Sequence, residues 1–143
     1  MIAIRQKLQQ LVNTIEAERG PFTLFGVFMR EDSPGRWDLV LSAPWLERGR
    51  LKALGQFVGL LEKAVGKEQV MSFSRIVTLN QDDRALDAIR EAVGTAKPPL
   101  EKDGHNLFGL PIERAYILRV KPHRPRPKKR KQRTAAYKSE RVR

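Results

Sequence analysis

The sequence predicts an α+β domain with a single mixed sheet of about five strands, helices packed on that sheet, and a disordered basic tail. Three observations support this prediction. Apolar residues recur at helical spacing in three segments, short apolar or alternating runs between Gly and Pro mark five strands, and positive charge gathers at one end. The predicted order is α-β-β-α-β-α-β-β, with the domain at 1–120 and the tail at 121–143.

The first helix is predicted ahead of Gly20 and Pro21. Glycine tolerates the left-handed conformation that often ends a helix, and proline cannot continue the hydrogen-bond ladder. Five apolar residues before this stop lie on one helical face: Ile4, Leu8, Leu11, Val12 and Ile15.

A β-hairpin is predicted over 22–43, with a turn at 31–35. The run 22–30 is almost wholly apolar, which favours a central strand buried on both faces. The run 37–43 alternates apolar and polar residues, as expected for a strand with one buried face. Val40 is the one apolar residue on the face expected to be outward.

The second helix is predicted over 47–65, with Gly66 as its cap. Its apolar stripe is wide enough to lie against a sheet and consists of Leu51, Leu54, Phe57, Val58, Leu60, Leu61, Ala64 and Val65. A third strand is predicted over 70–79, because this segment is rich in Val, Ile, Phe and Thr.

The third helix is predicted over 83–93, with Asn80 or Asp82 as its N-cap. Its inward residues are Leu86, Ile89 and Val93. A loop is predicted at 95–104. The last two strands are predicted at 105–108 and 112–120, around a turn at 109–111.

The residue inventory excludes several classes of site. The chain has no Cys, which excludes disulfides, thiolate metal sites and a Cys nucleophile, and its two His cannot form a multi-His metal site. We therefore predict no metal and no cofactor. No apolar run reaches the roughly 20 residues of a membrane span, and the N-terminus lacks the pattern of a signal peptide. We expect a soluble protein that is cytoplasmic or nucleoid-associated, or nuclear if the source is eukaryotic.

The segment 121–143 holds most of the excess charge. It has eleven Lys and Arg and one acid, a net charge of +10, whereas 1–120 has a net charge of +2. Such a segment stays disordered until it binds a partner, and cations that neutralise phosphates release condensed counterions. We therefore predict sequence-independent binding to the backbone of DNA or RNA through Arg124, Arg126, Lys128, Lys129, Arg130, Lys131 and Arg133.

Two other functions of the basic segment stay open. Residues 127–131 fit a nuclear-import signal, which requires a eukaryotic source. The segment could also attract an acidic protein, in which case the domain is an adaptor or regulatory protein. The sequence does not distinguish DNA from RNA, because it contains no recognition-helix, aromatic ribonucleoprotein or zinc-finger pattern.

A phosphate or anion site is predicted on the domain at Arg48, Arg50 and Lys52. These cations crowd the start of the second predicted helix, where the partial positive charge disfavours them unless an anion binds. Arg75 is a second candidate, because it shares the apolar face of its predicted strand and needs a partner or a ligand. The alternative is that Arg75 reaches water at a sheet edge or is turned outward by a bulge.

The segment with Leu24-Phe25-Gly26, Arg30 and Trp37-Asp38-Leu39-Val40 resembles the minimal nucleotidyltransferases. That resemblance implies a strand-to-helix turn followed by a strand with two metal-binding aspartates. Val27 stands where that family has Ser, and Arg36 stands where it has the first Asp. A single Asp38 cannot hold two metal ions. A degenerate domain of this kind, without the carboxylate pair, is therefore the third hypothesis. We predict no catalytic residue and favour a protein that is not an enzyme.

Overall fold

The computed structural model describes residues 2–32, 34–107 and 110–121, and it contains one mixed sheet of five strands in the order β3-β2-β1-β5-β4. The strands are β1 (Leu24–Arg30), β2 (Trp37–Ser42), β3 (Phe73–Thr78), β4 (Leu100–Leu107) and β5 (Leu110–Val120). The helices are α1 (Ile2–Arg19), α2 (Pro44–Glu47), α3 (Arg50–Val65), α4 (Lys67–Ser72) and α5 (Arg84–Val93). The predicted fold class and order are confirmed, with α2 and α4 as short additions.

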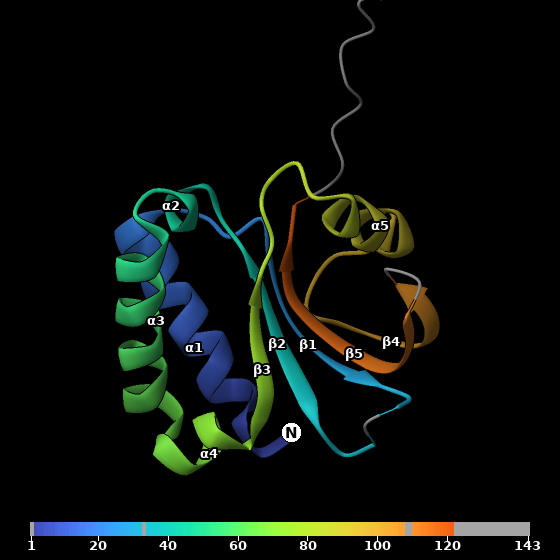
Figure 1. Cartoon of the computed structure of the whole chain (residues 1–143), viewed down its shortest axis with the longest axis horizontal. Coiled ribbons are helices and arrows are strands. Elements are labelled where there is room, and N and C mark those ends of the chain that lie inside the picture. Colours follow the sequence, from blue (N-terminus) through green and yellow to red (C-terminus); the bar gives the residue numbers. More distant parts are fainter. Residues whose placement is uncertain (1, 33, 108–109, 122–143) are drawn as a thin grey trace, which may run out of the picture.

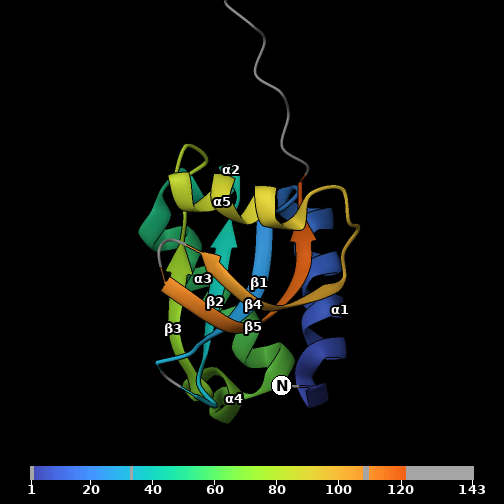
Figure 2. The same cartoon turned by 90° about the vertical axis from the view of Figure 1, so that its right-hand side faces the viewer.

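Helices cover both faces of the sheet (Figure 1). Helices α1 and α3 pack on one face, and α5 crosses the other near the start of β1 and the end of β5 (Figure 2). Each face has its own apolar core. The α1/α3 core includes Leu8, Ile15 and Phe57, and the α5 core includes Leu86 and Ile89. Because α5 is a single short helix, the second core is the smaller of the two.

The predicted hairpin is confirmed, and β1 is the central strand as expected. The prediction that one face of β2 points outward is wrong. Asp38, Val40 and Ser42 are all buried, and Val40 belongs to the α5 core. The alternation along β2 therefore separates two cores rather than a core from solvent.

The predicted third strand begins too early. Residues 70–72 belong to α4, and β3 starts at Phe73. Strand β3 runs parallel to β2 with a register shift, so that Phe73 is opposite Trp37 while Arg75 is opposite Asp38. Because of this shift, Phe73 packs in the α1/α3 core and not on the face of Arg75.

Two further details of the helices differ from the prediction. Leu51 was assigned to the inward stripe of the second helix but is 88% exposed, because α3 begins only at Arg50 and its first turn projects beyond the core. Asp83, rather than Asn80 or Asp82, caps α5, and its side chain accepts a hydrogen bond from the Ala85 backbone N–H.

The predicted loop at 95–104 is wrong in its second half, because β4 begins at Leu100 and pairs with β5. The charged residues at 101–103 led to the loop prediction. Charged side chains are common on edge strands, because they hinder pairing with a strand of another molecule. Part of the predicted turn at 109–111 lies outside the described residues. The predicted disordered tail lies outside them as well, apart from Lys121. None of the described helices is long and apolar enough to cross a membrane.

Candidate nucleic-acid interface

The cationic start of α3, which we define as Arg48, Arg50 and Lys52, is exposed to solvent. Gly49 precedes the helix in the left-handed conformation (φ 60°, ψ 52°), and no side chain caps the helix. The Arg50 guanidinium donates a hydrogen bond to Asn80 Oδ1 in the β3–α5 loop. The structure thus brings these three predicted residues together at an uncapped helix end, which suits an anion.

A chain of hydrogen bonds joins this region to the last described residue. The Gln81 backbone N–H donates to Glu47 at 2.8 Å, just before the cationic start of α3. The Gln81 side chain donates to Ser42 Oγ at 2.8 Å and accepts from Thr23 Oγ1 at 2.7 Å. The Lys121 backbone N–H donates to the Thr23 carbonyl at 2.9 Å. The basic segment therefore begins at the same end of the sheet as the cationic start of α3, the end where β2 and β5 finish.

Arg75 lies apart from that end of the sheet, on the α5 face and on the edge strand β3. Its guanidinium donates to Asp38 Oδ2 at 2.8 Å, and Arg30 Nε lies 3.5 Å from the same oxygen. The hydrogen bond to Asp38 raises the pKa of Arg75 above its usual value. The structure does not bring Arg75 to the cationic start of α3. Its anion site stays a prediction, and the buried carboxylate offers a structural reason for its place on an apolar face.

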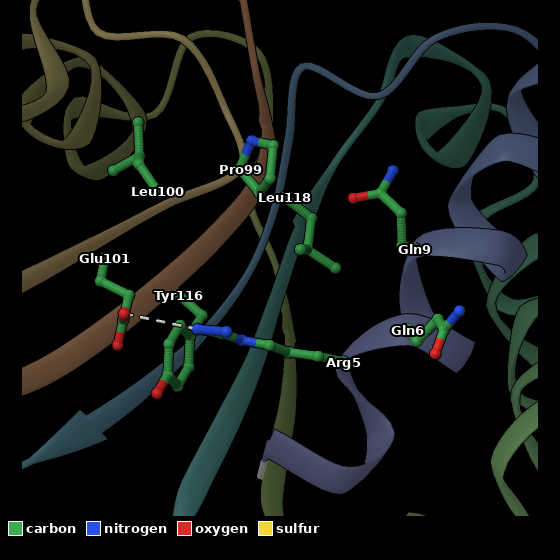
Figure 3. A pocket seen from close by; sticks show the side chains of 8 residues that line it. All are labelled: Arg5, Gln6, Gln9, Pro99, Leu100, Glu101, Tyr116 and Leu118. Atoms are coloured by element: carbon green, nitrogen blue, oxygen red, sulfur yellow. Dashed lines mark ion pairs between the residues drawn. The ribbon is translucent and has the colours of Figure 1, made fainter.

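A groove that sequence reasoning missed lies between α1 and the β4–β5 edge, with a volume of about 400 Å³ (Figure 3). The Arg5 guanidinium carbon lies 3.9 Å from the centre of the Tyr116 ring, and Arg5 pairs with Glu101 at 3.5 Å. Trp37 stacks on Tyr116 with ring centroids 5.6 Å apart. These residues are far apart in the sequence and follow no motif, so no local signal could have predicted the groove.

We expect Tyr116 to make stability sensitive to alkaline pH. The interaction of its hydroxyl with Glu101 and its burial both raise its pKa, against smaller opposing effects of Arg5 and Arg114. The folded protein therefore holds this proton more tightly than the unfolded chain does. The stabilisation is present below the unfolded-state pKa of about 10 and is lost as pH rises through the raised value.

The measurement is urea unfolding of wild type and Tyr116→Phe between about pH 9 and about pH 11. The wild type should lose more unfolding free energy than Tyr116→Phe over this range. Both proteins keep Tyr137 and every Lys, so the difference reports Tyr116 alone. Equal losses in the two proteins would contradict the assignment.

Among the described residues, no group of three or more His, Asp or Glu side chains is placed to hold a metal ion. The strand-to-helix turn implied by the nucleotidyltransferase resemblance is also missing. Strand β1 continues through Gly26, and a hairpin rather than a helix joins it to β2. Asp38 is committed to Arg75 and Arg30.

Comparison with protein-family models, with curated proteins and with solved structures gave no match to this chain. The predicted tail contacts, from Arg124 to Arg133, lie outside the described residues. A functional proposal therefore rests on two observations. These are the hydrogen bonds around Lys121, where the basic segment begins, and the charge of the sequence.

Proposed function

We propose that this protein binds nucleic acid, with the α+β domain holding a polycationic segment against the phosphate backbone. The observation that supports this most is the charge asymmetry: +10 in residues 121–143 against +2 in residues 1–120. A densely charged anionic polymer gains the most from such a segment, because each neutralised phosphate releases counterions. Binding of this kind is largely independent of sequence.

The place where the segment leaves the domain also supports the proposal. Lys121 is linked through Thr23, Gln81 and Glu47 to the cationic start of α3. A polyanion held by the segment would therefore meet further exposed cations at the same end of the sheet. These cations add electrostatic attraction that speeds association without reading bases.

The test is a binding titration of the full-length protein with a generic duplex and a generic single strand over a range of salt concentrations. If about six phosphates are neutralised, the logarithm of the affinity should fall with the logarithm of salt with a slope of about −5 on duplex DNA. The slope should be shallower on single strands, for which the value per phosphate is about −0.7 rather than −0.9.

Polyglutamate serves as the control polymer, because it carries carboxylates instead of phosphates. Binding to polyglutamate as tight as binding to the oligonucleotides would favour the acidic-protein partner. A flat salt dependence, or no binding to either oligonucleotide at low salt, would rule out the proposed function.

A further inference from the structure

A second cationic site lies where the basic segment leaves the domain. A cavity of about 300 Å³ is enclosed by the end of α5, the turn at 94–98 and the end of β5. Figure 2 shows these segments meeting at one edge of the molecule. Three cationic residues line the cavity, Arg90, Lys97 and Lys121, and no acidic residue does.

None of these three cations forms an ion pair with a carboxylate within the described part of the chain. The same holds for several other exposed cations, among them Arg48 and Lys52. What distinguishes Arg90, Lys97 and Lys121 is that they line one cavity. Cations that converge without a counter-charge repel one another, and this repulsion disappears when an anion binds among them.

Arg90 also has an unmet hydrogen-bond requirement. Its Nε is shielded from solvent and has no acceptor among the described residues. A buried donor without a partner costs about 1–3 kcal/mol. A small reorientation of the guanidinium towards an oxygen of a bound anion would remove that cost, and arginine suits the several oxygens of a phosphate.

The carboxyl end of α5 offers only a partial structural explanation. The helix dipole favours a cation in the last turn, by roughly 0.3–1 kcal/mol when exposed. That accounts for Arg90, but Lys97 and Lys121 come from the following turn and from the end of β5. Three full positive charges also outweigh the partial negative charge of the helix end.

The lining of the cavity is otherwise mainly apolar and includes Val93, Pro98 and Val120. Its volume is at the lower end of the range for small-ligand sites. A phosphate held by the three cations would place its attached sugar near these apolar side chains. The cavity thus matches one nucleotide unit better than an isolated inorganic ion.

We propose that this cavity binds a phosphodiester group of the same nucleic acid, an inference that rests on the proposed function. The basic segment starts at Lys121, so the cavity would hold the strand at the root of the segment. The segment would then follow the backbone away from the domain. This gives the domain a defined contact in addition to the general attraction of the charge.

The test compares two double variants of the full-length protein that remove the same charge. R90Q/K97Q neutralises two cations of the cavity, and K63Q/K67Q neutralises two exposed lysines near α4, at the opposite end of the molecule (Figure 1). The probe is a short oligothymidylate, titrated at several salt concentrations. R90Q/K97Q should bind about tenfold more weakly at low salt, with a slope flatter by about 1.4, which corresponds to two single-strand phosphates. K63Q/K67Q should stay within about threefold of wild type.

Ala96→Glu provides a second measurement that keeps every cation. It places a carboxylate at the cavity and is compared with Gln69→Glu, which adds the same charge in exposed α4. Ala96→Glu should bind several-fold more weakly than Gln69→Glu. Thermal unfolding of all four variants shows whether each is folded. If one cavity variant is not folded, the other cavity variant and its matched control provide the test.

The outcomes separate the two proposals. Equal losses in the cavity variants and in their matched controls would overturn the cavity site and leave the proposed function standing. A wild-type protein that does not bind the oligonucleotide at low salt would overturn the proposed function, and the cavity site with it.

Discussion

A chain that ends at Lys121 is expected to bind oligonucleotides at least about 100-fold more weakly than the full-length protein at low salt, a loss of ~2.7 kcal/mol. The deletion removes ten Lys and Arg and one acid. Three or more lost phosphate contacts are enough for an effect of this size near 0.1 M salt. The measurement is a titration of both chains against the same duplex and the same single strand.

The deletion should leave the domain folded, because every residue of the two described cores precedes residue 121. Thermal unfolding of both chains is the control for this point. A full-length variant with Gln at each of the seven predicted tail cations separates charge from length. It should bind almost as weakly as the deleted chain. If both altered chains kept wild-type affinity and salt slope, the basic segment would have no role in binding.

The elements that sequence reasoning predicted well are those whose signals are local. The apolar run at 22–30 and the Gly-Pro stop after α1 need no distant partner to be recognised. The hairpin was predicted for the same reason, since its strands are neighbours in the sequence. Within the candidate interface, the cationic start of α3 was predictable because its three cations are clustered along the chain.

The errors arise where a distant segment decides the environment of a residue. The sequence predicts an outward Val40, because nothing in β2 indicates that α5 covers its second face. The charged start of β4 resembles a loop unless its position at the sheet edge is known. The register shift in β3 places Phe73 and Arg75 on opposite faces, and an alternation count cannot detect it.

The cavity at the start of the basic segment could not be predicted from the sequence for a similar reason. Arg90, Lys97 and Lys121 come from three separate places in the chain, and each is an ordinary cation in its own sequence context. Only the approach of β5 to the end of α5 brings them together. The Asp38–Arg75 pair likewise depends on the parallel register of β2 and β3.

Asp38→Ala is expected to destabilise the domain by about 3 kcal/mol, at the lower end of the range for breaking a buried ion pair. The Asp38 side chain is only 6% exposed, and it lies within 3.5 Å of two guanidiniums, those of Arg75 and Arg30. Its removal leaves two like charges without their shared counter-charge. Arg75 is half exposed and can turn towards water, which limits the loss. Urea unfolding gives the free energy, and a double-mutant cycle with Arg75→Met isolates the pair.

The same pair tests whether Arg75 is an anion site. If its guanidinium serves mainly to neutralise Asp38, Arg75→Gln should lower the unfolding free energy and leave the salt slope of oligonucleotide binding unchanged. Arg50→Gln should do the reverse, since Arg50 lies on the surface at the start of α3. A salt slope that flattens by about 0.9 on duplex DNA in Arg75→Gln would assign Arg75 to phosphate binding instead. We expect the first result, because the Arg75 guanidinium already donates to the buried Asp38 carboxylate at 2.8 Å.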